Sequence, residues 1–231
     1  MSKYLELKRQ AFEANLELNN RGLVVYTWGN VSQIDRAEGV IAIKPSGVAY
    51  ADMTVDDIVV VDLDNQVVEG RLRPSSDTRT HTHLYRHFKA IGGVTHTHST
   101  YATAWAQAQQ AIPCLGTTHA DYAYGDIACT AIMSDAQIER DYEEETGVQI
   151  TDCYQQRDPL ESPMVIVAGH APFTWGTDAA QSVVHAVILE EIAKMAYLTR
   201  TLKQDVQPLK QGIIDKHYLR KHGKNAYYGQ S

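Results

Sequence analysis

The sequence predicts an α/β fold in which helices cover both faces of a largely antiparallel central sheet, giving three layers. Short runs rich in β-branched residues follow one another at close spacing between residues 23 and 69, as in an antiparallel meander. Longer stretches with helical signals precede and follow these runs. No repeat, linker or low-complexity segment divides the 231 residues, so we expect one domain over residues 1–231.

The N-terminal half should consist of a helix, a meander and a second helix. The first helix covers roughly Ser2 to Asn20, where Gly22 can cap its end. The expected strands are residues 23–26, 30–35, 39–43, 58–63 and 67–69, with a helical turn at residues 55–57. A helix over Ser75 to Ala90 then leads into the C-terminal half.

In the C-terminal half we expect a short strand ending near His96 and a strand at residues 165–167. Helices are expected over residues 99–110, near 134–145 with Ser134 as its cap, and from Asp178 to about residue 202. A last helix should lie within the polar, aromatic tail of residues 210–231.

Composition excludes several classes of protein. The formal net charge of −7 and pI near 5.8 argue against a nucleic-acid-binding surface. The polar N-terminus does not resemble a signal peptide, and no apolar run is long enough to span a bilayer. The three cysteines, Cys114, Cys129 and Cys153, lack ligand spacing and are read as free thiols, which predicts a cytoplasmic protein.

His96 and His98 are the most informative residues of the chain. They follow the apolar residues Ile91 and Val94, and residues two apart in a strand project to one face. Both imidazoles would therefore point to one place, as a divalent metal requires. A pair of histidines at this spacing also arises by chance, so further ligands are needed to support a metal site.

Two other residues supply such ligands. His170 ends a second apolar run that begins at Val165, and Pro172 closes it. Three neutral imidazoles with an oxygen donor suit zinc and leave positions open for a substrate. Asp77 is the best carboxylate for a fourth ligand or for a base beside the metal.

Three other histidines are interpreted as structural. His83 and His87 are four residues apart in a predicted helix, which is a metal-binding spacing, but their surroundings are polar and predict a solvated helix. His185 lies in an apolar helical stretch and is expected to be a packed, hydrogen-bonded core residue.

Three loops have the composition of an anion-binding pocket. Each alone fits an ordinary turn or helix cap, but together in one metal-binding chain they favour a phosphate site. Their candidate residues are Gly29 and Asn30, then Lys44, Ser46 and Gly47, then Ser75 and Ser76.

Two further polar segments contain candidate functional residues. The loop from Gly116 contains His119, which can hydrogen-bond, and Asp121, which can act as an acid or base; a polar turn explains it equally well. Near the C-terminus, Tyr227 and Tyr228 follow several basic residues, which favours a docked segment over a frayed end.

Over nearly its whole length the chain resembles the class II aldolase and adducin-head family, and within it the sugar-phosphate epimerases. The histidine pair marks the wider family, whereas the Asp121 loop and the terminus are more specific to the epimerases. The matching segments are Thr27-Trp-Gly-Asn-Val-Ser, Ile43-Lys-Pro-Ser-Gly-Val, Pro74-Ser-Ser-Asp-Thr, Val94-Thr-His-Thr-His-Ser, Gly116-Thr-Thr-His-Ala-Asp-Tyr, Asp215-Lys-His-Tyr-Leu-Arg-Lys-His-Gly and Ala226-Tyr-Tyr-Gly-Gln.

The resemblance implies one Zn²⁺ per subunit, which other divalent metals can replace, held by His96, His98 and His170 with Asp77 at or near it. It implies Asp121 and Tyr228 as an acid/base pair. It also implies a homotetramer in which the tail, about residues 210–231, completes a neighbour's site. The implied substrate-binding residues are Gly29, Asn30, Lys44, Ser46, Gly47, Ser75, Ser76, Thr117, His217 and Arg220.

The implied reaction interconverts L-ribulose 5-phosphate and D-xylulose 5-phosphate. Because the C4–H is not adjacent to the carbonyl, the expected route breaks and re-forms C3–C4, with zinc as Lewis acid on the C2 and C3 oxygens. An aldolase for fuculose or rhamnulose 1-phosphate and a metal-free adducin-like interaction module are the alternatives. The sequence leaves open whether L-arabinose, L-ascorbate or another pentose route supplies the substrate.

Overall fold

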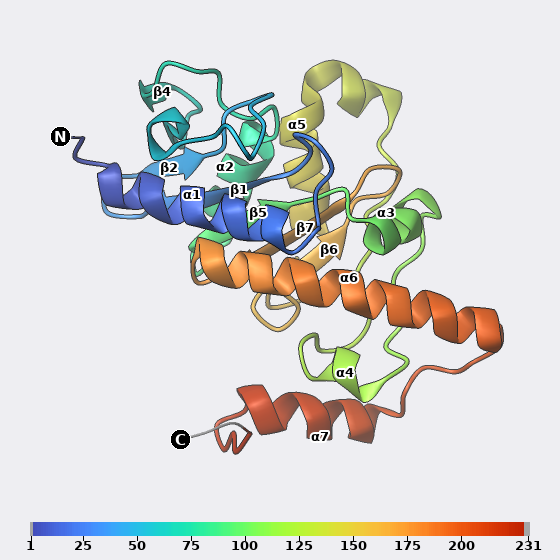
Figure 1. Ribbon diagram of the computed structural model, residues 1–231. Helices are drawn as coiled ribbons and strands as arrows, with labels where there is room; N and C mark the ends of the chain where they lie inside the picture. The colour runs from blue at the N-terminus through green and yellow to red at the C-terminus, as the bar shows by residue number, and fades with distance from the viewer. Residues whose placement is uncertain (1, 229–231) are drawn as a thin grey trace.

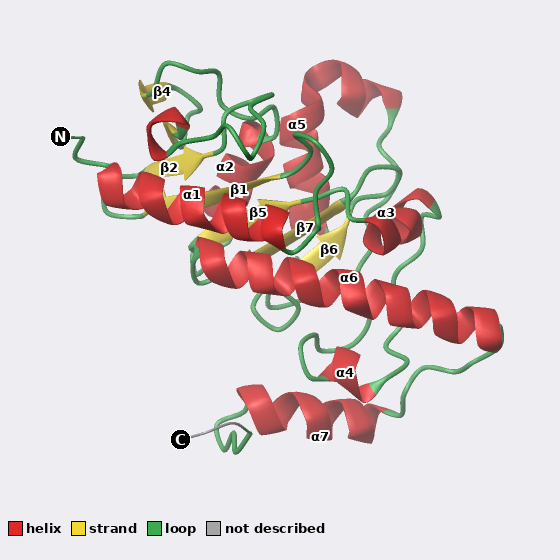
Figure 2. Ribbon diagram, viewed as in Figure 1, coloured by secondary structure: helices red, strands yellow, loops and turns green. Residues whose placement is uncertain are grey.

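The computed structural model describes residues 2–228, which are built around one seven-stranded sheet (Figure 1, Figure 2). The order of the strands is β4-β3-β2-β1-β5-β7-β6, and all neighbouring strands are antiparallel. The strands are β1 (Asn30–Asp35), β2 (Val40–Ile43), β3 (Val59–Asp62), β4 (Val67–Glu69), β5 (Gly93–His96), β6 (Met164–Ile166) and β7 (Pro172–Gly176).

Helices cover both faces of the sheet, so the predicted fold class is confirmed (Figure 1). α1 (Leu5–Asn20) and α6 (Ala179–Leu202) pack on one face, and α2 (Thr78–His87) and α5 (Asp135–Asp152) lie on the other. The alternation of side chains explains why both layers form. In β3, Val59 and Val61 face the cluster under α2 and α5, whereas Val60 faces the cluster under α1.

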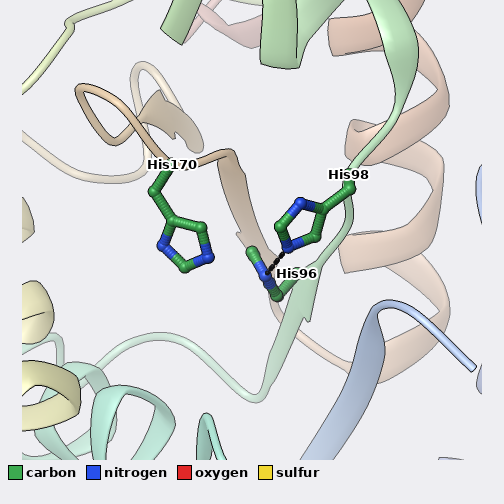
Figure 3. Close-up of side chains that lie close together, drawn as sticks. All are labelled: His96, His98 and His170. Carbon is green, nitrogen blue, oxygen red and sulfur yellow. Dashed lines mark hydrogen bonds between the residues drawn. The ribbon is translucent and has the colours of Figure 1, made fainter. Parts of the chain in front are cut away.

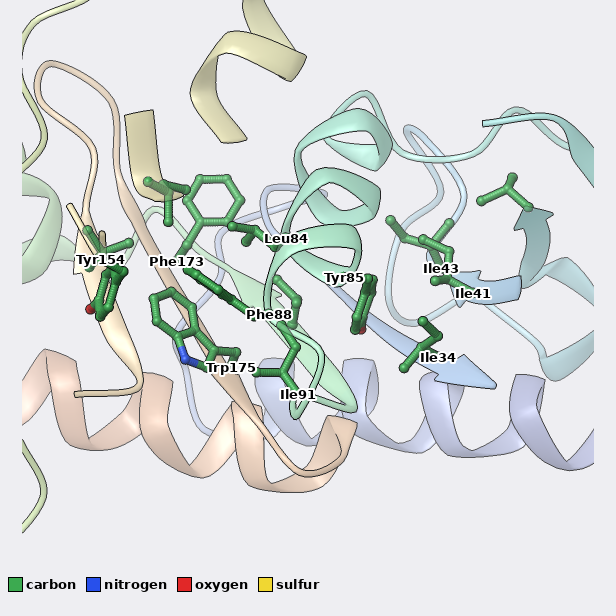
Figure 4. Packing of buried hydrophobic residues seen from close by; sticks show 14 of the residues in the cluster. Ile34, Ile41, Ile43, Leu84, Tyr85, Phe88, Ile91, Tyr154, Phe173 and Trp175 are labelled. Atoms are coloured by element: carbon green, nitrogen blue, oxygen red, sulfur yellow. The ribbon is translucent and has the colours of Figure 1, made fainter. Parts of the chain in front are cut away.

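The core beneath α2 and α5 is rich in aromatic residues (Figure 4). Trp175 is fully buried there and packs against Phe88 and Tyr154 at centroid distances of 5.2 and 5.1 Å. α5 approaches α2 closely because it has a glycine at the crossing: a Cβ on Gly147 would lie 2.7 Å from the His83 side chain. This packing fixes α2, which carries part of the site described below.

The remaining helices lie outside these two layers. α3 (Thr100–Gln107) packs against α6, and a 3₁₀ turn, η1 (Val55–Asp57), precedes β3. α4 (Thr117–Ala120) and α7 (Gln211–His222) pack against each other, on the side of α6 away from the sheet (Figure 1). Among residues 2–228, no helix is both long enough and apolar enough to cross a lipid bilayer.

Several predicted boundaries are wrong for identifiable reasons. Residues 23–26 do not form a strand: residues 23–25 are irregular and lead into a turn, in which Tyr26 has a φ of 54° and the Trp28 amide donates to the Val25 carbonyl at 3.1 Å. α2 begins at Thr78 because residues 75–77 form a turn in front of it. β7 was not predicted, because Pro172 was read as ending the preceding strand, whereas it begins the next one.

The helices show two further differences. α4 was missed because four residues carry no periodic signal. α5 runs seven residues beyond its expected end, with a kink at Asp141 (φ −171°, ψ 95°), although its capping box at Ser134 and Gln137 forms as predicted.

Candidate active site

Three of the predicted metal ligands meet at one edge of the sheet (Figure 3). His96 is the last residue of β5, where it pairs with Asn30 of β1 and Phe173 of β7. His98 lies two residues further on, and His170 lies in the turn between β6 and β7. One ring nitrogen from each histidine lies within 4.8 Å of the other two, and the Nε2 atoms of His96 and His98 are 3.2 Å apart.

The protonation of these imidazoles suits a metal. His96 Nδ1 donates to the Pro172 carbonyl at 2.9 Å, which leaves the Nε2 lone pair directed at the cluster. Burial, then the neighbouring His96, lowers the pKa of His98 to about 4 and that of His170 to about 3. Their lone pairs are therefore available at neutral pH, and no other such group of metal-binding side chains occurs among residues 2–228.

Asp77 lies beside this cluster, outside the group of mutually close nitrogens. It occupies the N-cap position of α2 but makes no capping bond; instead its Oδ2 accepts from Asn30 Nδ2 at 2.7 Å. Burial raises the pKa of its carboxyl, but His96, His81 and the Asn30 bond outweigh burial and lower it. Asp77 is therefore an ionised carboxylate adjoining the three imidazoles.

A cavity of about 590 Å³ joins the histidines to the predicted phosphate loops. The loops are tied to each other, because the Ser75 amide donates to the Lys44 carbonyl at 3.0 Å and the Ser46 amide to the Arg73 carbonyl at 2.9 Å. The predicted residues that line the cavity are Gly29, Asn30, Lys44, Ser46, Gly47, Ser75, Ser76, Asp77, His96, His98 and His170.

Two of these residues explain how the cavity is built. Gly29 has a φ of +79°, and a Cβ there would lie 2.8 Å from the His96 carbonyl, so only glycine lets this loop approach β5 so closely. Lys44 is 1% exposed, and its Nζ donates to the Val48 carbonyl at 2.7 Å. Burial lowers the pKa of Lys44 to about 8.

Sequence reasoning missed five residues that line the cavity: Thr27, Trp28, Pro45, Tyr142 and Glu143. Thr27 and Trp28 directly precede Gly29, and Pro45 lies between Lys44 and Ser46, so closeness in the sequence to predicted cavity residues is a usable signal. The Trp28 ring lies 6.1 Å from that of His98. Tyr142 and Glu143 come from α5, just after its kink, and nothing local in the sequence connects them to the histidines.

Asp121 lies in a second cluster, at the contact of α4 with α7. Its two carboxylate oxygens each accept from Arg220 Nη2 at 2.9 Å, His217 Nδ1 donates at 3.0 Å, and Lys221 Nζ is 3.6 Å away. Burial raises the pKa of Asp121, but the hydrogen bonds from Arg220 and His217 and the charges of Lys221 and Arg220 outweigh burial and lower it. The Tyr228 ring packs on Arg220 and Lys221, at 5.1 and 4.4 Å from their charges.

Within one chain, this Asp121 cluster does not reach the metal cavity. Asp121, Tyr228, His217, Arg220 and Thr117 are all absent from the cavity lining, and Thr117 is an exposed residue at the start of α4. The tail therefore packs on its own α7, with the Tyr228 amide donating to the Arg220 carbonyl at 3.2 Å. Gly229, Gln230 and Ser231 of the quoted terminus lie outside the described residues.

The three histidines interpreted as structural stay outside the metal cluster. The solvated helix expected around His83 is wrong, because α2 is buried against α5 and His83 lies 2.7 Å from Glu144 Oε1 and 3.2 Å from Thr151 Oγ1. His87 is exposed and stacks on His83 at 4.0 Å. His185 donates to the Trp175 carbonyl at 2.6 Å, so its predicted hydrogen bonding is confirmed.

Comparison with known proteins identifies the family. Residues 9–197 match the model of the Class II Aldolase and Adducin N-terminal domain. The proteins named L-ribulose-5-phosphate 4-epimerase UlaF in Salmonella paratyphi A and Salmonella typhi are each 54% identical over 225 residues, 97% of this chain and 99% of theirs.

Solved structures share the fold at lower identity. An L-fuculose 1-phosphate aldolase superposes with a TM-score of 0.78 at 22% identity, over 94% of this chain and 95% of its own. The enzyme of that name from Glaciozyma antarctica PI12 also gives 0.78, at 19% identity, over 97% of this chain and 84% of its own. The family match and the full-length relatives show that this chain belongs to the class II aldolase and adducin family.

Proposed function

We propose that the chain is a metal-dependent L-ribulose-5-phosphate 4-epimerase, an isomerase that produces D-xylulose 5-phosphate. The observation that carries the proposal is one cavity in which three clustered imidazoles adjoin a set of phosphate-type loops. The 54% identity to proteins of that name over nearly the whole chain supports the choice of substrate. The imidazole donor set fits Zn²⁺, and other divalent metals are alternatives.

The phosphate of the substrate would bind at the loop end of the cavity. Ser75 and Ser76 line the cavity directly before α2, so an anion there would lie at the N-terminal end of this helix. Lys44 is held rigidly on the adjoining loop and supplies a positive charge. A phosphate anchored there leaves the rest of a five-carbon sugar extending toward the histidines.

Inversion at C4 then requires the C3–C4 bond to break and re-form, because the C4 proton is not acidic. A divalent metal at the histidines would supply Lewis-acid polarisation of the C2 carbonyl. The phosphate loops would retain the aldehyde fragment while it turns to present its other face. The C4 oxygen must lose a proton on one face and regain one on the other, so two acid/base groups are needed.

We assign those two roles to Asp121 and Tyr228. Since neither lines the cavity of its own chain, a neighbouring copy must bring its Asp121 cluster to this cavity. A cyclic homotetramer satisfies that requirement, with residues 210–231 of one copy completing the next copy's site along with Thr117, His217 and Arg220. We infer one domain per chain, acting on a small molecule in the cytoplasm, with no membrane or nucleic-acid partner.

A direct assay tests the proposal. The purified, zinc-loaded protein should convert L-ribulose 5-phosphate to D-xylulose 5-phosphate, lose this activity on chelation and regain it with zinc. The solved aldolases of this fold make a sugar-phosphate aldolase the second candidate. Release of dihydroxyacetone phosphate from fuculose or rhamnulose 1-phosphate, without any epimerisation, would replace the proposal by that candidate. Absence of stoichiometric metal would favour an adducin-like interaction module.

A further inference from the structure

A ladder of polar side chains connects β1 to α2 directly behind the metal cluster. Asn30 and Ser32 share one face of β1, and each contacts a residue of the α2 segment. Asn30 Nδ2 donates to Asp77 Oδ2 at 2.7 Å, and Ser32 Oγ lies 2.7 Å from His81 Nδ1. Four residues further along α2, Tyr85 Oη lies 2.9 Å from the same Ser32 Oγ. The ladder therefore places Asp77 and His81 one helical turn apart on the face toward β1.

His81 is an unusual member of this ladder, because it is 0% exposed and has only one of its two ring nitrogens paired. A buried polar atom without a partner is unfavourable, so an unpaired one requires an explanation, such as a role at a functional site. Tyr85 Oη donates to the Ser32 carbonyl at 3.0 Å. The Ser32 hydroxyl can then donate either to Tyr85 Oη or to His81 Nδ1. When it donates to His81 Nδ1, the single imidazole proton lies on Nε2.

The aromatic contacts locate His81 next to the metal cluster. The Phe173 ring stacks on His96 at a centroid distance of 4.2 Å and lies 6.2 Å from His170. The same Phe173 ring lies 6.1 Å from His81. Burial lowers the pKa of His81 to about 3, so its imidazole is neutral at physiological pH. A neutral N–H donor beside a carboxylate can hold that carboxylate without adding charge to the site.

We propose that His81 is a positioning residue for Asp77, donating from Nε2 to the Asp77 carboxylate when that carboxylate turns toward the metal. Ser32 fixes the ring through Nδ1, so the donor points in one direction. The inference rests on the metal site of the proposed function and assigns a role to a residue outside the cavity lining. His81 acts only through Asp77 and does not touch the substrate.

Matched variants distinguish the role of His81 Nδ1 from that of His81 Nε2. In His81→Asn the amide occupies the place of Nδ1 and can keep the bond to Ser32, but nothing replaces Nε2. We expect zinc affinity, measured by chelator competition, to fall about 10–100-fold, the effect typical of losing a partner of a metal-site residue. His81→Gln, whose amide reaches the place of Nε2, should recover part of this loss. Ser32→Ala keeps Nε2 and should cost less than His81→Asn.

A double-mutant cycle tests whether His81 acts through Asp77. Asp77→Asn and His81→Asn together should weaken zinc binding no more than Asp77→Asn alone. Independent, additive losses would overturn the proposal, as would wild-type zinc affinity in His81→Asn. The ¹⁵N NMR spectrum of the zinc-loaded wild-type protein provides a readout that needs no variant: a proton on Nε2 of His81 is expected, and a proton on Nδ1 refutes the assignment. If the wild-type protein binds zinc but does not epimerise, the proposed function fails while these measurements still decide the role of His81.

Discussion

The metal cavity and the Asp121 cluster are built in different ways. His96 is positioned by backbone pairing, in register with Asn30 and Phe173 in a continuous sheet, and His98 and His170 follow from the segments that adjoin those strands. The Asp121 cluster is held by side-chain ion pairs between α4 and α7, beyond the layer formed by α6. The paired strand ends fix the positions of the cavity histidines, whereas the Asp121 cluster depends on how two helices outside the layers pack together.

The difference also concerns charge. In the cavity, burial lowers the pKa of His98 and His170, so the lone pairs of these two imidazoles are available before a metal arrives. In the Asp121 cluster, Arg220 and His217 donate hydrogen bonds to the carboxylate that is proposed to exchange a proton with the substrate. We infer that binding of the substrate must loosen these contacts before Asp121 can act. Four predictions test this comparison.

His96→Asn should have the largest effect, with loss of both zinc and activity. The fold should survive, because His96 ends a strand whose backbone pairing does not depend on its side chain. Metal analysis, turnover and thermal unfolding measure the three quantities, and His87→Asn is the control because His87 is exposed and outside the cluster. Full activity with stoichiometric zinc in His96→Asn would contradict metal catalysis at this site.

Asp121→Asn should lower turnover by about 10²–10⁴-fold, the range typical of a general acid or base, with the zinc content unchanged. The retained zinc would show that the cavity binds the metal without help from the Asp121 cluster. The exposed Asp52→Asn is a matched control. Turnover near that of the wild-type protein would remove Asp121 from the acid/base pair.

Tyr228→Phe should reduce epimerisation by a similar or smaller factor, of the order of 10². The ring still packs on Arg220 and Lys221, so assembly should persist. Slow condensation of dihydroxyacetone with glycolaldehyde phosphate should remain, with an altered ratio of C4 epimers, and Tyr227→Phe is the control.

Mixed assemblies extend this prediction. Co-assembled His96→Asn and Asp121→Asn chains should recover up to about a quarter of the wild-type activity. In a random mixture, about a quarter of the sites combine an intact metal cavity from one chain with an intact Asp121 cluster from its neighbour. Asp121→Asn mixed with Tyr228→Phe should recover none, since both residues come from one chain. Tyr228→Phe with the turnover and oligomer size of the wild-type protein would show that the tail is only a structural clamp.

The smallest effect concerns stability. Burial lowers the pKa of His81 to about 3 and that of His119 to about 4, from ordinary values of 6.5. Between pH 6.5 and about 4 these two histidines bind protons in the unfolded chain but not in the folded chain, so the free energy of unfolding should fall as the pH falls. Each of these histidines should contribute about 1.4 kcal/mol per pH unit there. Denaturant unfolding of the metal-free protein should show this slope, and a slope unchanged in His119→Gln would contradict the assignment.

The sequence by itself determined the features that depend on local pattern. Alternating apolar residues specify strands and their buried faces, and two histidines two apart at a strand end must share a side. The loops around Gly29, Lys44 and Ser75 were recognisable only as a set, because each alone fits an ordinary turn or helix cap. For these elements the relevant interactions lie within a few residues along the chain.

Only the tertiary structure decided which distant segments meet. The packing of α5 on α2 brings Tyr142 and Glu143 into the cavity, and the register of β1 against α2 pairs Ser32 with His81. The docking of α7 on α4 surrounds Asp121 with cations and keeps it away from the cavity of its own chain. None of these contacts leaves a local signal, because each depends on how layers formed by separate parts of the sequence pack together.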